Sequence, residues 1–415
     1  MTSIQIKDES KWNKFSQARR DRFFKSMILL SVFFVFIFTG CVLRIRDIYE
    51  QVYLPFDELR SSVYSEKSHE IEEMGKIYIK DNYIFVNEIE KGIHVIDISN
   101  PAQPEAISFI NIPGNVDISI LGSILYADSY IDLVAIDISN IGEVEEVYRI
   151  ENAFPDVCYY TDAGIYLGAE KVGSKLYWSG IVETGIPAPE AAPVNSSGTG
   201  GSMARFTIVN NYLLAIKGVS LVVFSLVNPS IPSWYSEVLV AWDIETIFPV
   251  SERNLLFIGS QRGMYIYDIS NMDRIMEVSE FSHATSCDPV VVQDNLAYVT
   301  LRSGNGCGGG NNDLIIVDIT NLWRPFEVDR YTMKNPFGLG IDENNLFICD
   351  GEAGLKIFDT SYIHDLKLIQ HFPGFTSYDV ILQDGISYVV GPEVIHLYDY
   401  SDINNILKLS DIKQD

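Results

Sequence analysis

The sequence predicts an all-β fold made of seven similar four-stranded antiparallel units. Three observations predict it: a short strand motif recurs along the chain, most copies follow one another at a step of about 40 residues, and turn-forming residues close each copy. Short, evenly spaced strands with regular turns favour sheets arranged radially, because that arrangement leaves only short, protected edges. We therefore expect a seven-bladed β-propeller of four-stranded antiparallel blades.

The repeated motif is an apolar strand that ends in an acid before a turn. Six copies end in an aspartate, and a seventh, LVVFS, ends at Ser225. The six acids are Asp97, Asp137, Asp268, Asp318, Asp359 and Asp399. We interpret them as structural, because an aspartate before a Ser-Asn or Thr-Asn turn can accept the N–H groups of that turn. Calcium binding would need carboxylates close together in one loop, and these lie in separate units.

Each copy of the motif is preceded by a strand that carries an aromatic residue or leucine at a fixed place. These residues are Phe85, Tyr126, Leu214, Phe257, Tyr298, Phe347 and Tyr388. A short apolar strand lies upstream of that one, and a more polar strand follows the motif, which gives four strands per unit. A solenoid is the alternative architecture, but the ends of the chain show no distinct capping repeats.

One step, from Asp137 to Ser225, is twice as long as the others. The extra residues include the run PAPEAAPVNSSGTGGS, whose Pro, Gly and Ser content would weaken a sheet. We expect an insertion at about 155–202 that offers a candidate contact region for partners. The segment CYYTDAGIYLGAE has strand character, so an eighth blade is the alternative.

The amino terminus resembles an export signal. A basic region is followed by the apolar run Met27 to Phe38 and then by Thr39-Gly40-Cys41. FTGC looks like a bacterial lipobox, so residues 1–40 are predicted to be a lipoprotein signal peptide and Cys41 to carry the lipid. Residues 41–74 would form a tether and lead-in, and 75–415 the propeller. A single membrane-spanning anchor at Ser26 to Leu43 is the alternative.

The repeats resemble LVIVD repeats, and the stretch from about Pro55 to the end resembles the bacterial LVIVD-repeat lipoproteins. The resemblance rests on the six motifs and on runs such as PGNVD, GTGGSMARF, HATSCDPVVV and NPFGLGID. It implies a propeller at the cell envelope, in a lipid-anchored position, with the outer membrane as the expected location. It implies no particular activity.

The net charge limits the classes of partner that the chain is expected to bind. The chain has 56 acidic and 30 basic residues, a formal charge of -26, and its first forty residues are basic. Such an acidic surface repels phosphate backbones, so nucleic acid is not expected as a partner. We expect contact with the membrane through the lipid on Cys41, and with other envelope proteins or an uncharged or cationic ligand.

A candidate binding face follows from the strand order. Because successive strands alternate in direction, the loops that lead into each first strand and those between second and third strands share one face of the disc. A polar, mainly acidic mouth on a propeller axis is a default binding position. The residues predicted there are Asp117, Asp128, Arg205, Glu245, His283, Asp288, Arg302, Asp350 and Asp379.

The sequence gives little support for catalysis. None of its six histidines lies in HExxH, and it has no GxSxG or P-loop motif. We therefore expect no catalytic residue and no cofactor, and a binding or scaffolding module as the function. A lyase or hydrolase that uses the acidic mouth is the alternative.

Four further cysteines follow the lipid-bearing one. Cys287 and Cys307 fall on the same face of the fifth blade, and the glycines around Cys307 let its loop bend back, so we expect a disulfide between them. Cys349 ends a second strand, where a buried thiol packs equally well. Cys158 begins the insertion, and its pairing is left open.

Overall fold

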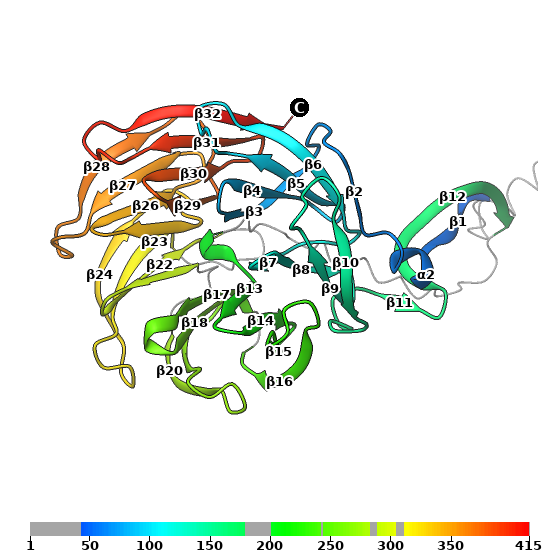
Figure 1. Ribbon diagram of the computed structural model, residues 1–415, viewed down its shortest axis with the longest axis horizontal. Helices are drawn as coiled ribbons and strands as arrows, with labels where there is room; N and C mark the ends of the chain where they lie inside the picture. The colour runs from blue at the N-terminus through cyan, green and yellow to red at the C-terminus, as the bar shows by residue number, and fades with distance from the viewer. Residues whose placement is uncertain (1–42, 179–200, 242–243, 283–288, 304–310, 415) are drawn as a thin grey trace, which may run out of the picture. The chain divides into compact units, whose positions relative to one another are not determined.

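The computed structural model describes residues 43–178, 201–241, 244–282, 289–303 and 311–414. The chain divides into two compact units, residues 1–53 with 167–193, and residues 54–166 with 194–415. The second unit contains seven four-stranded antiparallel sheets, one of which gains a fifth strand (Figure 1). The predicted all-β, seven-bladed fold is confirmed.

The first three blades each take four consecutive strands. Blade 1 consists of β3 (Met74–Lys80), β4 (Tyr83–Glu88), β5 (Gly92–Asp97) and β6 (Glu105–Asn111). Blade 2 consists of β7 (Ile118–Leu121), β8 (Ile124–Ser129), β9 (Asp132–Asp137) and β10 (Glu145–Ile150). Blade 3 consists of β13 (Phe206–Val209), β14 (Tyr212–Lys217), β15 (Ser220–Ser225) and β16 (Ser233–Leu239).

The remaining four blades repeat the pattern. Blade 4 holds β17 (Ile244–Val250), β18 (Leu255–Ser260), β19 (Gly263–Asp268) and β20 (Met276–Ser282), with the short 3₁₀-helix η2 (Ser251–Arg253). Blade 5 holds β21 (Val290–Gln293), β22 (Leu296–Leu301), β23 (Asp313–Asp318) and β24 (Phe326–Thr332). Blade 6 holds β25 (Leu339–Asp342), β26 (Asn345–Cys349), β27 (Leu355–Asp359) and β28 (Lys367–Phe372). Blade 7 holds β29 (Asp379–Gln383), β30 (Ile386–Val390), β31 (Val394–Asp399) and β32 (Leu407–Lys413).

The blades form a ring with the first strands innermost, because the first strands of successive blades contact one another from β3 round to β29. A hydrophobic cluster fills each junction between neighbouring blades, and the cluster of blades 7 and 1 closes the ring. The seven fixed aromatic or leucine positions of the second strands are all buried in this core. The apolar repeats are therefore buried between blades.

Local features recur in every blade. The pairing of the third and fourth strands contains a β-bulge in all seven sheets, for example between Val95 and Ile96 in blade 1. A bulge increases the local twist, which lets the polar outer strand wrap the edge of the blade. In the six blades whose third strand ends in an aspartate, that side chain accepts the N–H two residues on, at 2.7 Å from Ser99 to Asp97 in blade 1. The structural interpretation of these acids agrees with this geometry.

The lead-in to the propeller also forms secondary structure. It contains β1 (Leu43–Leu54), the short helix α2 (Phe56–Leu59) and β2 (Tyr64–Lys67), and β2 extends blade 1 beyond β6. In the described part of the insertion, β11 (Tyr160–Thr161) and β12 (Gly164–Trp178) form a three-stranded sheet with β1. The strand character of this segment therefore belongs to a separate sheet, which overturns the alternative of an eighth blade.

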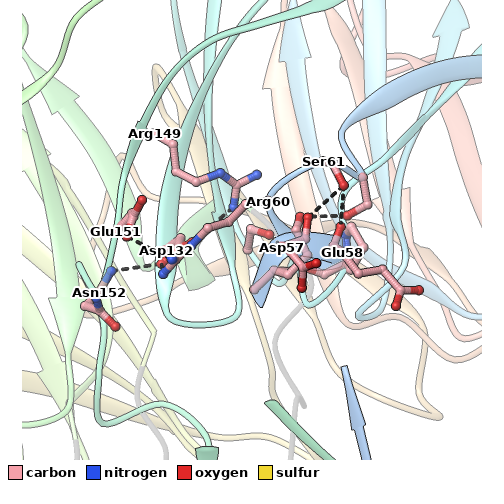
Figure 2. A network of polar contacts seen from close by, with 12 residues as sticks. Asp57, Glu58, Arg60, Ser61, Asp132, Arg149, Glu151 and Asn152 are labelled. Atoms are coloured by element: carbon pink, nitrogen blue, oxygen red, sulfur yellow. Dashed lines mark hydrogen bonds and ion pairs between the residues drawn. The ribbon is translucent and has the colours of Figure 1, made fainter. Parts of the chain in front are cut away.

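A buried carboxylate fixes the lead-in to blade 2 (Figure 2). Asp132, at the start of β9, accepts hydrogen bonds from Arg60 Nε at 3.0 Å, Arg149 Nη1 at 3.2 Å and the backbone N–H of Asn152 at 2.8 Å. Arg60 also pairs with Glu151 at 2.8 Å. The two guanidinium groups compensate the burial of the Asp132 charge, which makes this network an anchor of the fold.

Candidate functional site

The strand directions define two faces of the propeller. The upper face carries the loops that lead into the first strands and the turns between second and third strands, as expected from the sequence. The lower face carries the turns between first and second strands and those between third and fourth strands. The predicted binding residues that the structure describes belong to the upper face.

A short segment lies across the axis at the upper face. The 3₁₀-helix η1 (Gly201–Met203) contacts the first strands β3, β17, β21, β25 and β29, and Figure 1 shows this green coil inside the ring of blades. Ser202 is buried, donates a hydrogen bond from Oγ to Asp379 Oδ1 at 3.2 Å and accepts one from the Leu339 N–H at 3.0 Å. We call residues 201–205 the axial plug.

Glycines make room for the axial plug. Gly201 has a φ of +59°, in the left-handed region, and a Cβ there would lie 2.8 Å from the carbonyl oxygen of Val380. A Cβ on Gly338 would lie 2.0 Å from Asp379 Oδ1. Larger side chains at these two positions would therefore displace the contacts between the plug and blade 7.

Asp117 and Asp128 hold backbone groups at the junction of blades 1 to 3. Asp117 is buried, and its Oδ2 accepts from Lys76 Nζ at 2.6 Å and from the backbone N–H of Arg205 in the plug at 2.7 Å. Asp128 Oδ1 accepts from the N–H groups of Val116 and Asp117 at 2.8 and 3.0 Å. Burial raises the pKa of Asp128 to about 6 in spite of these bonds.

Asp350 and Asp379 are also buried, and both accept hydrogen bonds. Asp350 accepts from the N–H groups of Lys334 and Asn335 and from Lys356 Nζ at 2.5 Å. Asp379 accepts from the N–H of Val380 at 2.8 Å, and burial raises its pKa well above its usual range. These four acids were predicted to face a ligand, but in the structure their oxygens accept hydrogen bonds from the protein itself. Repeated blade loops turn inward here and need acceptors for their N–H groups.

The other predicted residues lie in different environments, and two of them lie outside the described residues. Glu245 is half-buried and accepts from Gln261 Nε2 at 3.3 Å, and the Arg302 guanidinium stacks on the Phe337 ring at 4.0 Å. Arg205 contributes its backbone to the plug. His283 and Asp288 lie outside the described residues, as do Cys41, Cys287 and Cys307. The predicted ligand-facing mouth, the lipid site and the disulfide thus stay predictions.

Two cysteines lie within the described residues, and both are free. Cys349 is fully buried in the core of blades 6 and 7, and burial raises its pKa well above the usual range. It acts as a packing residue, which was one of the two expectations for it. Cys158 is half-buried against a small cluster that includes Leu59 and Ile131.

A cavity of about 530 Å³ lies on the propeller axis, and sequence reasoning did not find it. It begins at Gly201 and Ala204 of the plug, and its wall comes from the first strands of blades 1, 2, 3, 4 and 7. Most of the lining residues are apolar, including Ile79, Ile120 and Ile208. The lining also reaches Asn210 in the turn that follows β13, on the lower face. We call this cavity the axial channel.

The turns at the lower end of the inner ring are acidic. They carry six exposed acids against two bases, Lys80 and Arg253. The acids are Asp81, Glu252, Asp294, Asp342, Glu343 and Asp384. Several occupy left-handed turn positions that favour Asp and Asn, such as Asp81 and Asp294 with φ of 54° and 53°. Turn chemistry selects some of these acids. The signal that could have revealed them is their recurrence after the first strands of blades 1, 4, 5, 6 and 7.

Comparisons with known proteins agree with this architecture. Residues 74–110 and 286–333, within blades 1 and 5, match the LVIVD repeat family. An uncharacterized protein of Archaeoglobus fulgidus is 29% identical over 103 residues, which is 23% of this chain and 16% of that protein. The match therefore spans about a sixth of the length of that relative.

Solved structures share the fold at low sequence identity. Hydrazine synthase of Kuenenia stuttgartiensis has a TM-score of 0.52 at 12% identity, covering 84% of this chain and 98% of that one. The computationally designed Ika8 protein has a TM-score of 0.51 at 9% identity, covering 83% and 88%. Hsv2 of Kluyveromyces marxianus has a TM-score of 0.50 at 8% identity, covering 83% and 99%.

The ring of seven blades defines the class of protein, a seven-bladed β-propeller. Two segments of this propeller, in blades 1 and 5, match the LVIVD repeat family. Within the described residues, no helix has both the length and the apolar character needed to cross a membrane. The apolar run Met27 to Phe38 lies outside them.

Proposed function

We propose that this chain is a binding module of the cell envelope, attached by lipid on Cys41, that takes an apolar, positively charged ligand into the axial channel from the lower face. The observation that carries the proposal is the channel itself, which is lined mainly by apolar side chains and ends at the plug. Its volume lies in the range of small-molecule sites.

The charge of the ligand follows from the lower face. The six exposed acids of the inner turns exceed the two bases by four charges, so a cation is attracted to this opening. An apolar ligand with a cationic group would place its apolar part in the channel and its charge near these acids. This agrees with the uncharged or cationic partner expected from the composition.

The buried acids of the upper face do not support the enzyme alternative. An enzyme that uses the acidic mouth would need carboxylates that reach a substrate, whereas Asp117, Asp350 and Asp379 are buried and accept hydrogen bonds from the protein. The basic region, apolar run and Cys41 support the lipid anchor.

Dye binding to the full-length protein in detergent tests the proposal. The probes are crystal violet, a cationic triarylmethane, and bromophenol blue, an anionic one, measured by equilibrium dialysis. Thr207 is half-buried, lines the channel and belongs to no hydrophobic cluster, so Thr207→Trp should fill the channel without disturbing the core. We expect this variant to bind crystal violet at least about tenfold more weakly, a loss of roughly 1.4 kcal/mol.

The matched control is Thr332→Trp, which places the same side chain at an exposed position at the end of β24. It should bind the cationic dye like the unchanged protein. Equal binding by Thr207→Trp and the unchanged protein, with both folded by circular dichroism, would refute the channel as the site. Equal affinity for the two dyes would refute the selection for cations.

A further inference from the structure

Three side chains suited to metal binding converge beside blade 1, away from the axis. His69 lies in the loop between β2 and β3, Glu88 ends β4, and His94 lies in β5. One ligand atom from each lies within 4.8 Å of the other two, and the described residues contain no other such group of three. The cluster combines two imidazoles with one carboxylate.

The hydrogen bonds of His69 leave one ring nitrogen available. Its Nδ1 lies 2.9 Å from the backbone carbonyl of Glu70. Because a carbonyl oxygen only accepts, Nδ1 carries a proton, and in the neutral ring Nε2 presents its lone pair. The Glu66 Oε1 atom lies 3.8 Å from Nε2, beyond hydrogen-bond distance. Metal-binding histidines are commonly oriented by such a bond from the second nitrogen.

The two oxygens of Glu88 have different neighbours. Lys91 Nζ lies 2.7 Å from Glu88 Oε1, which leaves Oε2 directed at His94.

Packing fixes the positions of both rings. The Phe109 ring centroid lies 4.4 Å from that of His69 and 4.7 Å from that of His94. Glu88 is fully buried and His94 almost so, whereas the His69 side chain is 41% exposed. Two ligands are thus held by the blade, and the third approaches from a solvent-facing loop.

A cavity of about 730 Å³ adjoins the cluster. His69 and His94 line it together with Ser68, Glu72 and residues of β32 in blade 7. A metal held by three protein ligands would therefore have room for water or a small ligand at the remaining position.

We propose that His69, Glu88 and His94 bind Zn²⁺, with the fourth coordination position facing this cavity. Imidazole and carboxylate are ligands that Zn²⁺ accepts, and three protein ligands with one open position are typical of exchangeable zinc sites.

Binding replaces one hydrogen bond by two metal–ligand bonds. His94 Nε2 and Glu88 Oε2 are 2.5 Å apart, and they would separate to roughly 3.3 Å as neighbouring ligands of a tetrahedral ion with bonds near 2.0 Å. In a neutral His94 ring the single proton then lies on Nδ1, so that Nε2 binds the ion and no net proton is released. Lys91 stays on the other oxygen of Glu88, so its charge opposes the metal.

Cobalt spectroscopy of the full-length protein in detergent tests the site. Co²⁺ is the probe, because a four-coordinate ion has strong visible absorption, and Zn²⁺ should displace it. We expect one equivalent to bind to the unchanged protein. His69→Ala removes an exposed ligand and should weaken binding by at least the factor of about 10–100 known for supporting residues. Lys91→Met should strengthen it.

The matched control is His364→Ala, because His364 forms a His–carboxylate pair with Asp329 on another blade. It should leave the titration unchanged. His94→Gln provides a second ligand variant that keeps a hydrogen-bonding group beside Glu88. If the unchanged protein shows no visible Co²⁺ bands, or if folded His69→Ala binds like the control, the site does not exist.

Discussion

At the residue scale, the acids of the upper face show how burial changes the role of a side chain. Asp128 Oδ1 accepts hydrogen bonds from Val116 N, Asp117 N and Asn115 Nδ2, the last at 2.8 Å. Its charge is destabilised by burial and by Asp117, with partial relief from Arg205. The Asp128 oxygen is therefore needed as a hydrogen-bond acceptor, whereas its negative charge destabilises the folded state.

We predict that Asp128→Asn is tolerated and that Asp128→Ala is destabilising. Asparagine keeps an acceptor oxygen, but alanine leaves buried N–H groups without a partner, at a cost of about 1–3 kcal/mol. Urea unfolding at pH 7 measures both variants. Equal losses for both would show that the carboxylate charge itself is required.

The comparison of Asp128→Asn with the unchanged protein also predicts how stability depends on pH. Because the folded pKa of Asp128 is raised from 3.8 to about 6, its contribution to stability is fully present below pH 4 and is lost as the pH rises towards 6. Asp128→Asn should therefore gain stability relative to the unchanged protein over that interval. A constant difference between them from pH 4 to 7 would contradict the raised pKa.

At the scale of elements, the axial plug connects blades that are distant in sequence. Ser202 bonds Asp379 across 177 residues and Leu339 across 137. The plug thus adds hydrogen bonds to blades 6 and 7 on the axis.

We predict that Ser202→Ala destabilises the propeller by about 1–3 kcal/mol, because the buried Leu339 N–H loses its acceptor. Thermal unfolding and amide exchange at Leu339 provide the measurements. Ser282→Ala is the control, since that exposed hydroxyl bonds only Glu280 among the described contacts, and surface changes cost little. Unchanged exchange at Leu339 in Ser202→Ala would show that the plug does not hold this strand.

At the scale of the whole molecule, packing between blades 7 and 1 closes the ring. Each blade takes consecutive strands, so closure depends on the cluster that includes Ile84, Ile395 and Leu397. The Gln414 side chain adds hydrogen bonds to Met74 N at 3.1 Å and to the Glu72 carbonyl. The Ser410 hydroxyl also donates to the Pro101 carbonyl at 2.5 Å, so side chains supply both the packing and these polar contacts.

We predict that Leu397→Ala lowers the free energy of unfolding by about 2–5 kcal/mol, because a fully buried leucine in a ring junction leaves a cavity. Leu407→Ala, on the neighbouring strand and 52% exposed, should change it by less than about 0.5 kcal/mol. Urea unfolding compares the two. Similar small effects in both would indicate that the ring does not depend on this junction.

The sequence by itself determined the four-stranded repeat, the order of strands within it and the role of the repeated acids. Each of these follows from local interactions: alternating apolar residues form strands, and Asp97 and its counterparts bond the N–H two residues away. Such contacts lie within a few residues of one another, so a repeated pattern is sufficient to predict them.

Only the tertiary structure decided where the binding features lie. Asp117 and Arg205, 88 residues apart, meet because the ring brings blades 1 to 3 around the plug, and His69 meets His94 because the lead-in adds β2 to blade 1. No local pattern encodes these distances. A loop aspartate becomes a buried hydrogen-bond acceptor only because neighbouring blades cover it. The channel exists only because the ring closes. Both features therefore depend on contacts between residues that are distant in the sequence.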